Sequence, residues 1–160
     1  MASSTATARR DGAAGFTLLE IIIVLVIIAM AATLVAPAVD AGFRAREVRS
    51  AVRGLAATMR SLQSDAVRKG VVQRLTVDPV QNAIQVQERE VQPLGDVAVI
   101  GELKGGELVA GGAVRVMFYP NGSTTGIDVV VAERGMPTRE GYVVRLDPLI
   151  GLVTIVDPTR

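Results

Sequence analysis

An uncharged apolar run from Ile21 to Val39 constrains this chain more than any other feature. Its nineteen residues, as a helix rising about 1.5 Å per residue, are long enough to cross a hydrocarbon core of roughly 30 Å. The run is apolar on every side, which a soluble domain rarely buries. We therefore predict a membrane-spanning helix. A buried core helix is one alternative. A cleaved signal peptide, cut near Ala29–Ala32, is the other, although its apolar region is usually only about 7–15 residues.

The segment before this run is polar and weakly basic. Residues 1–15 contain Arg9 and Arg10, and the sequence Gly-Phe-Thr-Leu-Leu-Glu then occupies positions 15–20. A carboxylate such as Glu20 costs about 2.5–3.5 kcal/mol if it is carried unpaired to the centre of a bilayer. Glu20 either stays at the interface or pairs with a cation. Cleavage between Gly15 and Phe16 in a second subunit would supply such a cation, the new α-amino group.

This hexapeptide in front of an apolar run resembles the class III signal of type IV pilins and type II secretion pseudopilins. The resemblance implies that a prepilin peptidase cuts after Gly15 and methylates the amino group of Phe16. It assigns Glu20 as the assembly determinant. It also implies a helix kink at Pro37, where related helices commonly carry a proline.

The charges flanking the run predict the opposite orientation to the resemblance. Four arginines follow the run, Arg44, Arg46, Arg49 and Arg53, whereas only Arg9 and Arg10 precede it. Counting Lys and Arg alone would place the C-terminal side in the cytoplasm. The resemblance instead implies a cytoplasmic leader and a body on the other side of the membrane, and the cleavage motif is the more specific signal.

A second helical pattern follows the apolar run. Apolar residues recur at alternating steps of four and three, which indicates one buried stripe on a helix: Val48, Val52, Leu55, Met59, Leu62 and Ala66. Gly70 is the expected stop, after two basic residues suited to the negative end of the helix dipole. Pro37 and Gly42 predict a bend or melted turn between the two halves. The basic side chains of residues 43–69 are interpreted as a solvated or subunit-pairing face, with a polyanion or anionic-lipid contact as the alternative.

The C-terminal half has the pattern of short β-strands separated by turns. The expected strands are residues 71–77, 83–86, 97–103, 114–118, 127–132, 142–146 and 152–156. Turn residues predict a hairpin between the first two strands and two successive hairpins among the last four. A long helix followed by antiparallel strands predicts an α+β fold in which the sheet covers the helical stripe.

The order of strands and turns in this half is similar to the GspH/FimT group of minor pseudopilins and minor pilins. The resemblance implies a pilin-like organisation: a cleaved leader at 1–15, a transmembrane and assembly helix at 16–40, an amphipathic helix at 41–70 and an antiparallel β domain at 71–160. The chain departs from many relatives at Gly151-Leu152, where they have Gly-Arg. It also lacks the Asp-rich calcium loop of the major pseudopilin.

The composition excludes several chemistries. The chain has no Cys and no His, so zinc sites with the usual ligands, cysteine nucleophiles and a Ser-His-Asp triad are excluded. We find no catalytic constellation and expect no enzyme activity, metal or cofactor. The 17 basic and 16 acidic side chains nearly cancel, and cleavage after Gly15 would remove Arg9, Arg10 and Asp11 and balance them. A nucleic-acid partner is therefore not expected.

Two functions remain. The first is a minor pseudopilin, a structural subunit near the tip of the periplasmic pseudopilus of type II protein secretion. The second is a FimT-like minor type IV pilin involved in pilus assembly or DNA uptake. Both imply a hetero-oligomeric filament with other pseudopilins or pilins, and processing by prepilin peptidase. Both also imply a single-pass protein of the bacterial inner membrane with its C-terminal domain in the periplasm.

Overall fold

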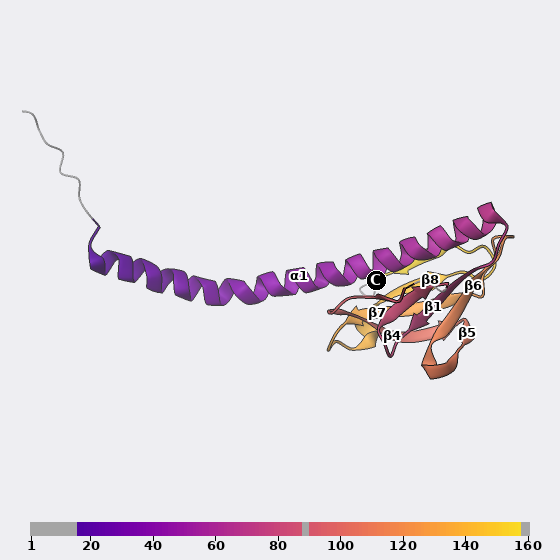
Figure 1. Ribbon diagram of the computed structural model, residues 1–160. Helices are drawn as coiled ribbons and strands as arrows, with labels where there is room; N and C mark the ends of the chain where they lie inside the picture. Colours follow the sequence, from indigo (N-terminus) through magenta and orange to yellow (C-terminus); the bar gives the residue numbers. More distant parts are fainter. Residues whose placement is uncertain (1–15, 88–89, 158–160) are drawn as a thin grey trace, which may run out of the picture. The chain divides into compact units, whose positions relative to one another are not determined.

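The computed structural model describes residues 16–87 and 90–157, without the side chains of 34–39, 41 and 110. The chain divides into two compact units, Met1–Asp40 and Ala41–Arg160. Helix α1 (Leu18–Lys69) contributes to both units, and all strands belong to the second (Figure 1). Each unit is considered in turn.

The first unit presents its apolar side chains to the outside. Phe16 is 78% exposed, and the large apolar side chains between Leu18 and Met30 are all exposed. Within the described part of the chain, no helix combines the length and the hydropathy of a membrane span. The backbone is helical at positions 37 and 42, so the expected melted turn is wrong. The side chain of Pro37 lies outside the described residues, and its kink stays a prediction.

The second unit contains two antiparallel sheets. The first sheet has the order β3-β2-β1-β6-β5 and the second has the order β4-β7-β8-β9. The strands of the first sheet are β1 (Gln73–Asp78), β2 (Ala83–Val86), β3 (Gln92–Pro93), β5 (Glu107–Leu108) and β6 (Val114–Phe118). Those of the second are β4 (Ala98–Gly105), β7 (Ile127–Glu133), β8 (Tyr142–Leu146) and β9 (Val153–Val156). The predicted α+β fold, with a long helix followed by antiparallel strands, is confirmed.

The strand pairing confirms two predicted hairpins and corrects a third. β1 pairs with β2, and β8 pairs with β9. The expected hairpin between β6 and β7 is wrong, because β6 pairs with β1 and β5 whereas β7 pairs with β4 and β8. The connecting turn closes on β6 itself, since Thr125 N donates to Met117 O over 3.1 Å. The chain then crosses to the second sheet.

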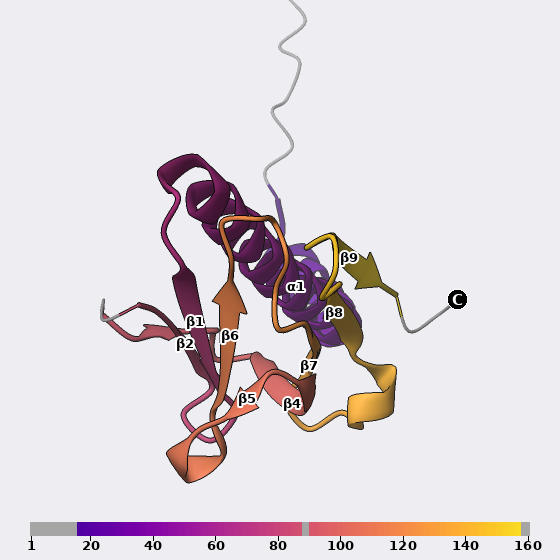
Figure 2. The same ribbon diagram turned by 90° about the vertical axis from the view of Figure 1, so that its right-hand side faces the viewer.

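The core lies between the C-terminal half of α1 and the two sheets. All six stripe residues of the helix are buried, as the 3.6-residue period predicts. They join one cluster with inward-facing residues of both sheets, among them Leu75, Phe118 and Val144. Figure 2, a view close to the helix axis, shows β1 and β6 on one side of α1 and β8 and β9 on the other. The helix ends as predicted at Gly70, whose φ of +66° suits a glycine.

Asn82 ties the first sheet to the second. It is the last residue of the turn between β1 and β2 and has a φ of +50°. Its side-chain amide donates to Gly95 O at 3.0 Å and Ala98 O at 2.8 Å, and its Oδ1 accepts from Ile100 N at 2.9 Å. One side chain therefore satisfies three backbone groups near the start of β4.

We expect Leu55→Ala to destabilise the second unit by about 2–5 kcal/mol, because it removes a fully buried side chain and leaves a cavity. Thermal unfolding of residues 41–160, followed by circular dichroism, measures the change. Ser64→Ala, on the exposed face of the same helix, is the control. Equal effects of the two substitutions would contradict the assignment of the stripe as the core face.

We expect Asn82→Ala to destabilise the same unit by about 2–3 kcal/mol, because it leaves partly buried backbone groups unpaired. Chemical denaturation measures the change. Gln81→Ala is the matched control, since this neighbour is exposed and its side chain makes no hydrogen bond within the described residues. A change in Asn82→Ala no larger than in the control would show that the amide does not hold the sheets together.

Candidate functional site

The N-terminal end of α1 carries the predicted processing and assembly residues. Gly15 lies outside the described residues, and Phe16 is exposed immediately before the helix. Thr17 caps the helix: its Oγ1 accepts from Glu20 N at 3.2 Å. Thr-x-x-Glu is the sequence of a capping box, in which residue three of the helix is Glu or Gln. The sequence at positions 15–20 therefore also caps the N-terminus of α1.

The position of Glu20 suits a negative charge. It lies in the first turn of α1, where the helix dipole stabilises a carboxylate by about 0.3–1 kcal/mol. Glu20 makes no ion pair within the described residues, and its exposed carboxylate is accessible to a partner. An α-amino group from another chain is one such partner.

The basic face of α1 is partly paired within its own domain. Arg44 lies 3.8 Å from Glu133, Arg49 Nε donates to the hydroxyl of Tyr142 at 2.9 Å, and Arg60 donates to Val153 O at 3.1 Å. The hydrogen bond to Tyr142 raises the pKa of Arg49 above its usual range. These contacts fasten the helix to the second sheet, which favours the structural interpretation of the basic residues over a polyanion site.

Three arginines of the second sheet and its connections, Arg134, Arg139 and Arg145, also make contacts within the domain. Arg145 makes a bidentate contact with Asp128, with its Nη2 at 2.9 Å, and this hydrogen bond raises the pKa of Arg145. Arg134 donates to Asp96 O, and Arg139 lies 4.0 Å from Glu140. The three arginines therefore do not form an unpaired basic patch.

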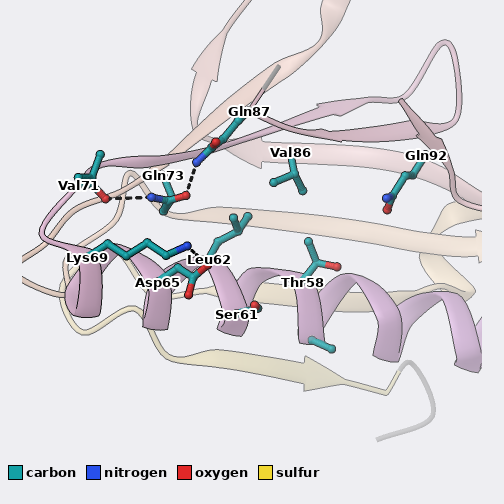
Figure 3. Close-up of a pocket in the computed structure, with 11 residues that line it drawn as sticks. Thr58, Ser61, Leu62, Asp65, Lys69, Val71, Gln73, Val86, Gln87 and Gln92 are labelled. Atoms are coloured by element: carbon teal, nitrogen blue, oxygen red, sulfur yellow. Dashed lines mark hydrogen bonds and ion pairs between the residues drawn. The ribbon is translucent and has the colours of Figure 1, made fainter. Parts of the chain in front are cut away.

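A polar groove runs between α1 and the first sheet (Figure 3). Its volume is about 650 Å³. Its lining comprises Ala57, Thr58, Ser61, Leu62, Asp65, Lys69, Val71, Gln73, Val86, Gln87 and Gln92. The side chain of Gln73 is buried. Its Nε2 donates to Val71 O, and its Oε1 accepts from Gln87 Nε2. Hydrogen bonds from Lys69 and Arg68 lower the pKa of Asp65. These groups satisfy one another and do not form a reactive pair.

The described residues contain no cluster of three or more potential metal ligands. Asp78 and Asp147 each accept backbone N–H groups of the turns that follow them, so both act as turn-forming residues.

Comparison with known proteins identifies the N-terminal motif and the fold. Residues 10–36 match the prokaryotic N-terminal methylation motif. The chain is 28% identical over 143 residues to type II secretion system protein H of Xanthomonas campestris pv. campestris, covering 84% of this chain and 83% of that protein.

Two solved structures are similar in fold. The minor pseudopilin EpsH from the type 2 secretion system of Vibrio cholerae matches with a TM-score of 0.57 and 12% identity, over 71% of this chain and 99% of that one. The type IV minor pilin FimU of Pseudomonas aeruginosa matches with a TM-score of 0.54 and 15% identity, over 72% and 92% of the two chains.

The N-terminus therefore resembles that of prepilin-type proteins, and the fold is similar to that of pilin-like proteins. Within that class, the chain is similar to the GspH-like minor pseudopilins, which confirms the resemblance predicted from its sequence.

Sequence reasoning missed the helix cap at Thr17, although Thr-x-x-Glu before an apolar run is a capping signature. It also placed Leu152 in the last strand, whereas β9 begins at Val153 and Leu152 is exposed. Leu149 and Ile150 lie in the turn expected before that strand and are exposed.

We expect cleavage between Gly15 and Phe16 in cells that contain a prepilin peptidase. Mass spectrometry of the membrane-extracted protein should find an N-terminal Phe16 carrying one added methyl group. Gly15→Leu should keep the leader, because a larger side chain at the cleaved bond hinders the peptidase. An intact leader on the unsubstituted chain would contradict the prediction.

Proposed function

We propose that this protein is a minor pseudopilin, a structural subunit of the periplasmic filament of type II secretion. The similarity to type II secretion protein H carries the proposal, because it spans most of both chains and includes the helix and the β domain. The methylation motif adds a reason to expect processing and assembly. A position near the filament tip belongs to the proposal as well. The proposed role is structural and requires no cofactor.

We propose that the apolar run anchors the protein in the bacterial inner membrane, with residues 41–160 in the periplasm. The exposure of the apolar side chains between Leu18 and Met30 supports this, because exposed apolar surface on this scale is stabilised by lipid or by other apolar helices. The proposed partners are prepilin peptidase first and other pseudopilins afterwards.

Glu20 is the proposed assembly residue. Its carboxylate would pair with the α-amino group that cleavage creates on Phe16 of an adjacent subunit. In a lipid environment such a pair offsets the cost of carrying either charge alone. Methylation of the amine retains its positive charge.

A FimT-like minor type IV pilin is the second candidate, favoured by the structural similarity to FimU. The neighbouring genes distinguish the two candidates. Genes for a secretion ATPase and other pseudopilins would favour the first candidate, and pilus or competence genes would favour the second. Within this second candidate, a role in DNA uptake has less support than a role in pilus assembly. Arg145 is paired with Asp128, and Leu152 follows Gly151 where many relatives of the group have arginine.

We expect Glu20→Gln to leave cleavage and insertion intact and to reduce incorporation into the filament. Glutamine retains the capping-box pattern and nearly the same shape but gives up the charge. Co-purification with other pseudopilins, together with a secretion assay, measures incorporation. A loss of at least about tenfold in recovered partner, equal to about 1.4 kcal/mol, is expected for a charge pair of this kind.

Thr17→Ala is the matched control for this experiment. It removes the capping oxygen, which costs about 1 kcal/mol of helix stability, and leaves the charge of Glu20 in place. Normal partner recovery by Glu20→Gln would show that Glu20 only occupies the helix start. A larger defect in Thr17→Ala than in Glu20→Gln would assign the motif to capping instead of charge pairing.

A further inference from the structure

Strand β9 lies at the edge of the second sheet, with β8 on its inner side (Figure 2). The two strands are antiparallel, and Asp147 N donates to Leu152 O just before β9 begins. Bonded and non-bonded residue pairs alternate along an antiparallel ladder. The backbone groups of Val153 and Ile155 therefore point away from β8, toward the outer edge of the sheet.

The outer edge of β9 is satisfied at one group. Arg60 on α1 donates to Val153 O at 3.1 Å, which confirms that this carbonyl faces outward. The N–H of Val153 and both backbone groups of Ile155 make no hydrogen bond within residues 16–87 and 90–157. An edge with unpaired N–H and C=O groups is a template for pairing with another extended chain.

A groove of about 350 Å³ lies between α1 and this part of the second sheet. Its lining comprises Arg49, Val52, Arg53, Tyr142, Ile155 and Asp157. We call it the edge groove. Its volume falls within the range of roughly 300–1,000 Å³ that is usual for ligand sites. The free edge of a strand along a groove is the arrangement in which an extended peptide adds a strand to a sheet.

The edge groove carries an excess of positive charge. Arg49 donates to the neutral hydroxyl of Tyr142, and Arg60, at the border of the groove, donates to a neutral carbonyl. Arg53 is exposed and makes no hydrogen bond or ion pair within the described part of the chain. Asp157 is the one carboxylate among the lining residues. Two arginines in the groove and one beside it therefore outnumber this carboxylate, which favours an acidic partner.

The two features of the edge groove favour a peptide over a lipid or a nucleic acid. A phosphate-rich partner would use the arginines and leave the backbone groups of Ile155 unpaired. An extended peptide offers N–H and C=O groups at the spacing of a strand, so its main chain is the complement of that edge. Its side chains alternate between the two faces of the sheet. The side chain opposite Ile155 would face α1, where a carboxylate meets Arg53.

We propose that the edge groove binds an extended acidic segment of another pseudopilin, which adds to the second sheet beside β9. The segment bonds through its main chain to Val153 N and to both backbone groups of Ile155, and one of its carboxylates pairs with Arg53. This inference rests on the proposed role in a filament of several different pseudopilins, and it names the chemistry of one partner contact. The membrane helices of assembled subunits strengthen the contact by raising its effective concentration.

Three synthetic peptides test the charge and the strand pairing separately, on the full chain in neutral detergent. The first alternates glutamate with threonine, and the fluorescence anisotropy of a label measures its binding. The second has lysine in place of glutamate. The third keeps the glutamates but carries a methyl group on the backbone nitrogen of each, which removes the N–H that would face Ile155. The first peptide should bind at least about tenfold more tightly than either of the others.

A charge reversal in the chain completes the test. Arg53→Glu should weaken binding of the glutamate peptide at least about tenfold. It should also make the lysine peptide bind more tightly than it binds the unsubstituted chain, a gain that a misfolded variant would not show. Arg74→Glu is the matched control, because Arg74 is an exposed arginine of β1 outside the edge groove. It should leave the binding of both peptides unchanged.

Each outcome decides the proposal. Binding of the glutamate peptide that is lost in Arg53→Glu and kept in Arg74→Glu supports it. Absence of binding overturns it, and so does equal binding of the N-methylated peptide, because charge alone would then suffice. A DNA duplex that displaces the peptide and binds more tightly, or self-association of the chain that Arg53→Glu abolishes, assigns the groove to another occupant and also overturns it. Co-purification of the unsubstituted chain with other pseudopilins is measured separately, so the proposed function can hold while this contact fails.

Discussion

The burial of one helical stripe organises the globular part of this protein. From Val48 to Ala66, α1 presents an apolar residue every three or four positions, and two separate sheets meet that stripe. Each sheet is small, and small sheets need a packed face for stability. The helix supplies that face to both. Contacts away from the core then fix the arrangement, because Asn82 joins the sheets and Arg49 and Arg60 fasten the helix to β8 and β9.

Much of this fold was predictable because its signals are local. The helix end at Gly70 and seven of the strands followed from period, turn residues and Gly or Pro positions. β3 and β5 were missed because they are two residues long and depend on pairing with neighbours. The hairpin between β6 and β7 was wrong for a related reason. Asn121-Gly122 signals a tight turn, but nothing in the turn specifies whether the next strand returns to the same sheet.

The functional residues also divide into those that the sequence predicts and those that only the structure identifies. Phe16 and Glu20 are identified by a short motif, because the proposed processing and charge pairing would need specific residues at a fixed spacing. The turn that contains Leu149 and Ile150 was also predicted, because Asp147-Pro148 and Gly151 are turn-forming residues. The hydrogen bond from Gln63 to Ile150 O was not predicted, because it joins residues far apart in the sequence. Contacts of this kind are found only from a structure, whereas the N-terminal motif is found from the sequence.

The distribution of charge explains why assembly would depend on a few contacts. Several arginines that an external polyanion would need are engaged within the domain, as Arg145 is by Asp128 and Arg44 by Glu133. The 17 basic and 16 acidic side chains of the chain nearly cancel, so its long-range attraction to neighbouring proteins is weak. Its specificity must then come from short-range features. In the proposed membrane role, Glu20 would provide a charge in an apolar environment, where pairing is worth most. The proposed pairing of Glu20 would thus take place in the medium that strengthens it.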